Sequence, residues 1–336
     1  MITIHIGLHK TGSSSIQFAL RSIDAHQYGP IIVPQPGVGS SDELLRANLM
    51  RLRAAGRGVL SDENVIGQPF DGYAAMDRRL ALMADVLGGT PTRVVVYLRP
   101  QHSWLASVFV QLVQQGQGAD AERFWAAMRG FENLDWTILL ARLRAALPSA
   151  AITALAYTGG DVVEDFLRQA GLPPVRSGAP IEENVSIAPV QVPLLAAVNA
   201  TIPPGPDQAR VRACFQTVLG PGARRNLSVF PEDVQSAITA AYRDRWQVLT
   251  DTADGSARPA FQRGLDTWPP TPVPSAGTSL DDPAVQAEAI RALSVLTSQA
   301  WAGSPGLVQR TVTWVRRSPR TAPARAWRRI TRRRTA

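Results

Sequence analysis

The residues best suited to chemistry stand near the start of the chain, in a short loop bounded by two glycines. Gly7 and Gly12 enclose Lys10, and three serines follow at positions 13–15. Glycine lets the backbone turn tightly around an anion, and the N–H groups at the start of a helix attract negative charge. Lys10 adds a positive charge within the loop. The segment predicts a phosphate-binding loop between a buried strand and a helix; the alternative is an ordinary glycine-containing turn.

A second polar position follows an apolar, β-branched run from Arg93 to Leu98. Such a run is typical of a strand buried on both faces. Arg99 then stands at the carboxyl end of this strand, where open parallel sheets bind ligands. Ser107 lies further on, in a segment of helical character. Because an Arg at a strand end and a Ser on the next helix can bind one phosphate together, we expect a second phosphate site at this position.

The two motifs together resemble those of bacterial sulfotransferases that use 3′-phosphoadenylyl sulfate (PAPS). A Walker A loop would place its lysine directly after the second glycine, whereas this loop reads Lys-Thr-Gly-Ser-Ser-Ser. The resemblance implies that the loop holds the 5′-phosphosulfate of PAPS and that the later Arg and Ser hold its 3′-phosphate. The cofactor-binding residues that it implies are Lys10, Thr11, Gly12, Ser13, Ser14, Ser15, Arg99 and Ser107.

Sulfuryl transfer needs a cation near the leaving phosphate and a base for the acceptor hydroxyl. Lys10 is the expected cation. The resemblance implies a Glu or His as the base, and Glu63, at the end of another short strand, is the first candidate. Asp62 is the second candidate and His9 a weaker one. A solvated acidic turn or a helix cap would also explain the acidic pair. His102 would either assist at the 3′-phosphate or face solvent.

The elements that position these residues alternate between strand and helix. Strands are expected before Gly7 and at 31–34, 58–64, 93–98 and 151–157; helices are expected at 14–23, 40–55, 73–87, 101–112, 121–128, 135–147, 161–170, 190–198 and 231–249. This alternation predicts an α/β fold of three layers, a mostly parallel sheet with helices on both faces, as in P-loop NTPases. A helical or linker extension would follow at the C-terminus.

Length and composition suggest three parts. The chain has 336 residues, of which 45% are hydrophobic, so it can bury a large core. We expect the α/β domain over 1–250 and an extension over 251–315. Within the extension, 259–283 is rich in Pro, Gly, Ser and Thr and should be a linker or loop. A basic tail covers 316–336. It holds nine arginines and no acid, and subtracting them from the net charge of +8 leaves −1 for the rest.

Partners follow from the tail and from what the composition lacks. The arginines predict contact with an anionic membrane or glycan, either as a solvated tail or as a surface anchor with Trp314, Trp327 and Ile330. No nucleic-acid-binding motif accompanies the tail. The single cysteine excludes an internal disulfide framework, and His and Cys show no metal-ligand spacing, so no metal is expected. We expect no signal peptide and no membrane span, hence a cytoplasmic protein that is peripheral to a membrane at most.

The resemblance implies transfer of a sulfuryl group from PAPS to a hydroxyl of a carbohydrate or small-molecule acceptor, leaving adenosine 3′,5′-bisphosphate. Two alternatives stay open. A P-loop kinase acting on a small molecule would need an Asp at the end of a second strand to hold Mg²⁺, whereas Arg99 ends the strand over 93–98. The other alternative is a protein of the same fold that binds the nucleotide without catalysis.

Overall fold

The computed structural model describes residues 1–34, 41–118, 120–159, 162–175, 187–200, 205, 209 and 227–275. The basic tail and the single cysteine, Cys214, lie outside these residues. The chain divides into two units, each described by itself. The first comprises 1–104, 128–181 and 238–269, and the second comprises 105–127, 182–237 and 270–336.

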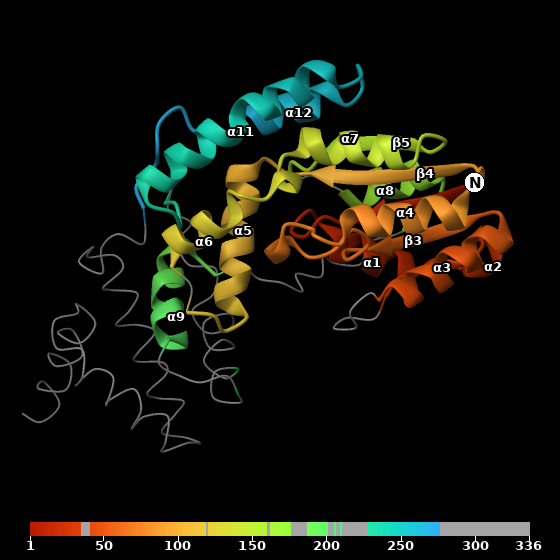
Figure 1. Ribbon diagram of the computed structural model, residues 1–336, viewed down its shortest axis with the longest axis horizontal. Helices are drawn as coiled ribbons and strands as arrows, with labels where there is room; N and C mark the ends of the chain where they lie inside the picture. Colours follow the sequence, from red (N-terminus) through yellow and green to blue (C-terminus); the bar gives the residue numbers. More distant parts are fainter. Residues whose placement is uncertain are drawn as a thin grey trace, which may run out of the picture. The chain divides into compact units, whose positions relative to one another are not determined.

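The first unit contains a five-stranded parallel sheet (Figure 1). Its strands are β1 (Ile2–Ile6), β2 (Ile31–Ile32), β3 (Gly58–Asp62), β4 (Thr92–Leu98) and β5 (Ala151–Ala156). Their order across the sheet is β2-β3-β1-β4-β5, and β1 pairs with β3 on one side and β4 on the other. Because every pair is parallel, the loops after β1, β3 and β4 leave the sheet at the same edge.

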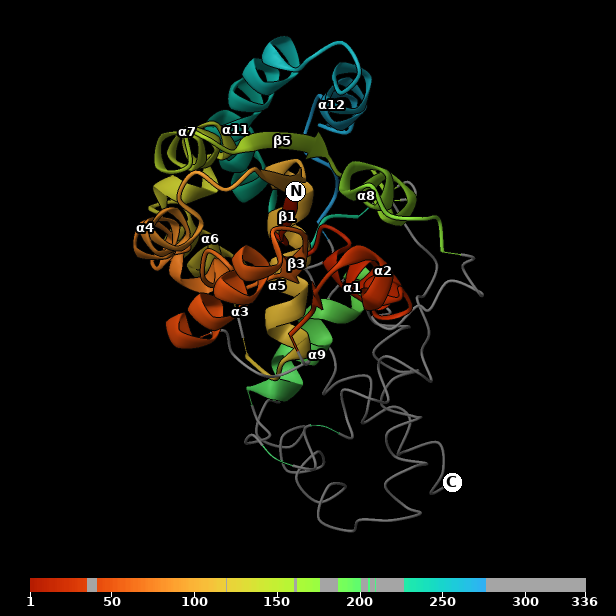
Figure 2. The ribbon, with the colours of Figure 1, turned by 90° about the vertical axis from the view of Figure 1, so that its right-hand side faces the viewer.

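Helices cover both faces of this sheet, which gives the three layers that the sequence predicted. One face carries α1 (Ser13–Arg21) and α8 (Val162–Ala170), and the other carries α3 (Asp42–Ala55), α4 (Met76–Leu87) and α7 (Trp136–Ala146) (Figure 2). The short helix α2 (Ala25–Tyr28) follows α1. The α/β class and the parallel sheet are confirmed.

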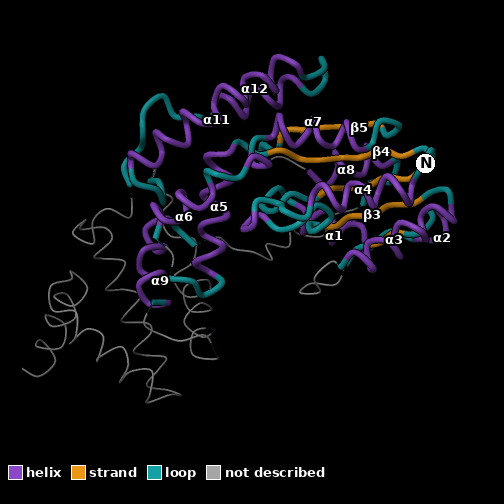
Figure 3. The backbone as a smooth tube through the Cα atoms, viewed as in Figure 1, coloured by secondary structure: helices purple, strands orange, loops and turns teal. Residues whose placement is uncertain are grey.

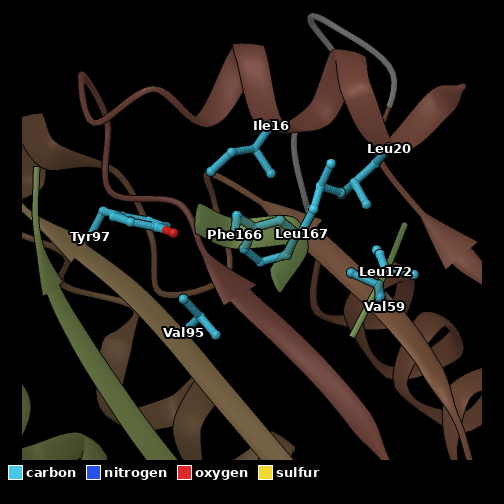
Figure 4. Packing of buried hydrophobic residues seen from close by; sticks show 8 residues of the cluster. All are labelled: Ile16, Leu20, Val59, Val95, Tyr97, Phe166, Leu167 and Leu172. Carbon is cyan, nitrogen blue, oxygen red and sulfur yellow. The ribbon is translucent and has the colours of Figure 1, made fainter. Parts of the chain in front are cut away.

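The core on the α1 and α8 face explains why these segments fold as they do. Ile16 and Leu20 are four residues apart, so they share one side of α1 and are fully buried. They meet Phe166 and Leu167 of α8 above side chains of β3 and β4 (Figure 4). On β1 every residue is buried, as a central strand between two helical layers requires.

The helix α4 starts three residues later than its apolar spacing predicts. We expected a helix from residue 73, but a 3₁₀ turn at Pro69–Asp71 comes first and Tyr73 has a φ of 59°. A non-glycine residue in this left-handed conformation cannot belong to an α-helix. The helix therefore begins at Met76, and Tyr73 is fully buried in the preceding turn.

The region expected as a linker over 259–283 is partly wrong. Helix α12 covers Arg258–Asp266, directly after α11 (Glu232–Thr252). Proline in the first turn of a helix loses no intrahelical hydrogen bond, so Pro259, the second residue of α12, does not prevent the helix. The indole N–H of Trp246 donates to the Phe261 carbonyl at 3.0 Å and joins the two helices.

The described part of the second unit consists mainly of helices and loops (Figure 3). Helix α5 (Gln101–Gln114) has its first four residues in the first unit and the rest in the second. Helix α6 (Ala121–Met128) lies in the second unit except for its last residue, and α9 (Val192–Asn199) lies wholly in the second unit. Phe109, Phe124 and Phe230 form an aromatic cluster with ring centroids 5.2 to 6.1 Å apart. Phe109 is thus a core residue. Among the described residues, no helix is long and apolar enough to cross a membrane.

Candidate functional site

The three polar positions that the sequence suggests for chemistry lie at one edge of the sheet. The loop of residues 7–12 follows β1, Glu63 follows β3 and Arg99 follows β4. The chain leaves β1 toward β2 on one side of the sheet, whereas it leaves β4 toward β5 on the other. Ligands of open parallel sheets bind where the order of strands changes direction in this way. The topology therefore brings the loop and Arg99 to the expected position for a ligand.

Backbone geometry makes the loop a cradle. Gly12 has a φ of 82°, and Lys10 is one of only two non-glycine residues with positive φ in the described part of the chain. A Cβ on Gly7 would lie 2.7 Å from the Ser13 hydroxyl oxygen, so only glycine fits there. The N–H groups of residues 12–15 have no hydrogen-bond acceptor among the described residues. These four groups at the start of α1 can bind an anion.

The hydroxyl groups of the loop divide into two kinds. Thr11 and Ser13 are buried, and both donate to the Leu8 carbonyl, at 2.5 and 3.3 Å. These two side chains hold the loop in shape. Ser14 is half-buried and Ser15 is exposed. The role of the three serines as phosphate ligands stays a prediction.

Arg99 lies directly against the loop. Its Nη1 donates to the Lys10 carbonyl at 3.1 Å, and its Nε donates to the Ser103 hydroxyl at 3.1 Å. The Tyr157 ring faces the guanidinium, with its centroid 5.7 Å from Cζ. The two hydrogen bonds use two of the five N–H groups of the guanidinium, so donors remain for an anion. The structure thus brings Arg99 to Lys10, although 89 residues separate them.

Charge in the site is predominantly positive. Burial lowers the pKa of Lys10, and the nearby Arg99 charge lowers it further, while Glu63 acts in the opposite direction. Burial also lowers the pKa of Arg99. Burial raises the pKa of Glu63. The Lys10 charge lowers this pKa, and the Asp62 charge raises it further. Two half-buried cations and one half-buried carboxylate thus lie near one another, an arrangement that a bound anion would stabilise.

The other candidate bases have different surroundings. Asp62 is buried, and its Oδ1 accepts the backbone N–H of Asn64 at 2.7 Å, which shapes the turn after β3. His9 is buried with Nδ1 unpartnered among the described residues, and burial, assisted by the Lys10 charge, lowers its pKa to about 4. Glu63 is the half-buried member of the three and the one whose charge acts most directly on Lys10.

The two residues expected near the 3′-phosphate are placed differently. His102 packs against Trp268, with ring centroids 4.4 Å apart, and burial lowers its pKa to about 4, assisted by the Arg99 charge. The alternative of a solvent-facing His102 is therefore wrong. Ser107 is half-buried on α5, four residues after Ser103, and belongs to the second unit. Its role as a phosphate ligand stays a prediction.

Sequence reasoning missed several residues that build this site. Ser103 orients Arg99, and its position four residues later on a helix was the available signal. Trp104 lies in the segment predicted as a helix over 101–112, and its indole N–H donates to the His9 carbonyl at 2.7 Å. Trp136 similarly donates to the Arg99 carbonyl at 2.8 Å. Apolar spacing predicts that a tryptophan is buried, but it does not identify the acceptor of its N–H group.

No family model, no curated protein and no solved structure matches the chain. Within the described residues, His, Cys, Asp and Glu side chains form no group of three that could hold a metal ion. The functional assignment therefore depends on the residues at the sheet edge. Chemically, they offer N–H donors and two cations to an anion, with a carboxylate beside them.

Proposed function

We propose that the protein is a PAPS-dependent sulfotransferase that transfers a sulfuryl group to a hydroxyl of a carbohydrate or small-molecule acceptor. One observation carries this proposal: Arg99 donates to the backbone of Lys10 and its charge lowers the pKa of the Lys10 ammonium, so two cations from different strand ends lie near each other. A single phosphate cradle needs no second cation of this kind. A nucleotide with phosphates at both the 5′ and 3′ positions would use both.

The residues present fit such a nucleotide. The N–H groups of residues 12–15 and the Lys10 ammonium would hold the 5′-phosphosulfate. Gly7 lets Ser13 pack closely beneath the loop, because a Cβ at residue 7 would clash with its hydroxyl. The remaining N–H groups of Arg99 would hold the 3′-phosphate. PAPS supplies the activated sulfuryl group, which has adenosine 3′,5′-bisphosphate as its leaving group.

Each polar side chain then has a role in transfer. Lys10 stabilises the negative charge that develops on the leaving phosphate, as positioned cations do in phosphoryl transfer. Glu63 accepts the proton of the acceptor hydroxyl. Because burial raises its pKa, ionised Glu63 is a stronger base than a solvated glutamate. The nearby Lys10 charge lowers the pKa of Glu63 and so favours its ionised form.

The strand order gives the kinase alternative one specific observation in its favour. Asp62 ends β3, which is the neighbour of β1 in the sheet. P-loop NTPases hold Mg²⁺ with a loop Ser or Thr and an Asp at such a strand end. Asp62 and Ser14 could form this pair, so Arg99 at the end of β4 does not by itself exclude a kinase. The charge on Arg99 remains the feature that favours PAPS.

Calorimetry in the absence of metal tests the proposal directly. We expect adenosine 3′,5′-bisphosphate to bind the wild-type chain and to bind Arg99→Ala about a hundredfold more weakly, since charge-assisted hydrogen bonds are lost. Arg51→Ala, an exposed arginine on α3, is the matched control and should bind as the wild type does. Absence of binding, with ATP binding only when Mg²⁺ is added, would refute the proposal in favour of the kinase.

Turnover distinguishes an enzyme from a nucleotide-binding protein of the same fold. Wild-type chain supplied with PAPS and a panel of hydroxylated sugars and small metabolites should release adenosine 3′,5′-bisphosphate with at least one acceptor. Lys10→Ala should bind the bisphosphate more weakly and release none. Tight binding without release on any acceptor would support the non-catalytic alternative.

A further inference from the structure

Three buried aromatic side chains lie behind the site, and none has a role in the chemistry proposed so far. Tyr73, Trp104 and Trp136 come from three separate segments, and each is fully buried. The Trp104 and Trp136 rings meet edge to face with centroids 5.1 Å apart, and the Tyr73 ring centroid lies 6.5 Å from that of Trp104. Edge-to-face packing between buried rings is favourable and geometrically specific. The three rings therefore form one buried, packed group.

Each indole N–H in this group is bonded to the backbone of a site residue. Trp104 donates to the carbonyl of His9, the residue before Lys10, and Trp136 donates to the carbonyl of Arg99 itself. The two acceptors belong to the two different phosphate positions. Since the two rings pack on each other, the loop after β1 and the end of β4 are fixed to the same support.

Other contacts close this arrangement into a ring. Arg99 Nη1 donates to the Lys10 carbonyl, so the two fixed segments also bond to each other. Lys10 and Tyr73 are the two non-glycine residues with positive φ in the described chain, at 65° and 59°. Backbone strain of this kind persists only where surrounding structure enforces it, and it concentrates at functional sites. At Lys10, the Trp104 bond to the preceding carbonyl and the Arg99 bond to the Lys10 carbonyl supply that enforcement.

We propose that Trp104 and Trp136 are positioning residues that set the separation between the 5′ and 3′ phosphate sites. By doing so they determine the preference for a nucleotide phosphorylated at both positions over one phosphorylated at the 5′ position alone. The inference rests on the proposed function, because it assigns the loop and Arg99 to the two phosphates of PAPS.

Calorimetry with two nucleotides tests this role. The ratio of the Kd of 5′-AMP to the Kd of adenosine 3′,5′-bisphosphate measures what the 3′-phosphate contributes. We expect this ratio to fall about fivefold to tenfold in Trp136→Phe and in Trp104→Phe, the effect of one lost hydrogen bond that positions a charged group. Trp104→Phe should also weaken 5′-AMP binding, because it releases the loop. Phenylalanine keeps the ring packing and removes only the N–H donor.

Trp246→Phe is the matched control. Trp246 is also fully buried in the first unit and donates to a backbone carbonyl, that of Phe261 at 3.0 Å, but this acceptor lies on α12. A loss of stability without a positioning role would affect all three variants alike, so thermal melting is measured for each. We expect Trp246→Phe to keep the wild-type ratio.

The outcomes distinguish failure of the positioning role from failure of the proposed function. A wild-type chain with no preference for the bisphosphate contradicts the proposed function and the inference together. A wild-type preference that both Trp104→Phe and Trp136→Phe retain overturns the inference alone. Should either variant not fold, hydrogen exchange of the wild type decides: the bisphosphate must slow exchange around residues 7–15 and 99–104 together, and slowing at the loop alone overturns the inference.

Discussion

At the scale of single residues, the site combines groups that disfavour one another when no ligand is bound. Lys10 and Arg99 carry the same charge, and burial disfavours the charged form of both. Such an arrangement destabilises the folded chain slightly and is retained where a function requires it. A bound polyanion offsets the repulsion between Lys10 and Arg99. The same two charges that destabilise the ligand-free site therefore contribute to ligand affinity. Glu63 is the group that keeps this balance from becoming wholly positive.

Glu63 gives the first prediction at this scale. Burial raises its pKa above 4.5, so the ionised base is lost at a higher pH than for a solvated glutamate. We expect kcat/KM for sulfuryl transfer to fall on the acid side with an inflection above pH 4.5. Glu63→Gln should lower kcat by about a hundredfold or more and remove the inflection. It should also bind adenosine 3′,5′-bisphosphate at least as tightly as the wild type, because a negative charge beside Lys10 is gone.

Glu43→Gln is the control for this experiment, since Glu43 is exposed on the first turn of α3. A Glu63→Gln variant that keeps both kcat and the inflection contradicts the assignment of the base. The same pH profile then tests Asp62→Asn and His9→Asn, the two remaining candidates.

At the scale of elements, strand β1 gives a prediction about acid stability. His5 is fully buried on β1, with Nδ1 2.8 Å from the Ser61 hydroxyl oxygen, and burial lowers its pKa from 6.5 to about 3. The unfolded chain therefore binds a proton below pH 6.5 that the folded chain does not. Stability from neutral His5 is complete above pH 6.5 and is lost as the pH falls. Between about pH 7 and pH 5 this histidine costs about 2 kcal/mol.

Urea unfolding at about pH 7, 6 and 5 measures this effect. His5→Asn should have a smaller loss of unfolding free energy between about pH 7 and pH 5 than the wild type, by about 2 kcal/mol. His9 and His102 contribute with the same sign, so the variant retains part of the pH dependence. His26→Asn, at an exposed position on α2, should match the wild type. If the unfolding free energy depends equally on pH in the wild type, His5→Asn and His26→Asn, then His5 is not buried as a neutral group.

The packing of α12 gives a second prediction at this scale. A Cβ on Gly264 would lie 2.6 Å from a ring atom of Trp246, so this glycine allows α12 to approach α11 closely. Gly264→Ala gains up to about 1 kcal/mol of helix propensity. We nevertheless expect a net loss of about 1 to 3 kcal/mol, because the added methyl overpacks the contact. Thermal melting measures it, with Gly255→Ala, where a Cβ meets no atom within 4 Å, as the neutral control.

These elements also show what the sequence could and could not predict. Apolar runs and helical spacing identified the strands of the sheet, and the order of motifs identified Lys10 and Arg99 as partners at its edge. The assignment of α12 to a linker was wrong because it used composition alone. Pro259 lies in the first turn of this helix, and Gly264 allows the helix to pack closely on Trp246. The left-handed Tyr73 was also missed, since tertiary packing, and not local preference, imposes that conformation.

At the scale of the whole molecule, charge is the feature that the site does not explain. The chain carries a formal +8, but nine arginines between 316 and 334 account for more than all of it. The remaining residues sum to −1, so the positive charge of the site is local. Attraction of the chain to an anionic surface should therefore depend on the tail and not on the α/β unit.

A chain that ends at residue 315 tests this division. We expect the full chain to sediment with phosphatidylserine vesicles, or to bind heparin, at about 0.1 M salt, and the shortened chain to do neither. Both should bind adenosine 3′,5′-bisphosphate with similar affinity. At about 1 M salt, screening removes the arginine contribution, so binding that persists there would come from apolar contacts of Trp327 and Ile330. Complete loss of binding at high salt would identify a purely electrostatic tail. Equal vesicle binding by the two chains would contradict a role for the tail and would move the search for a membrane or glycan contact to the rest of the protein.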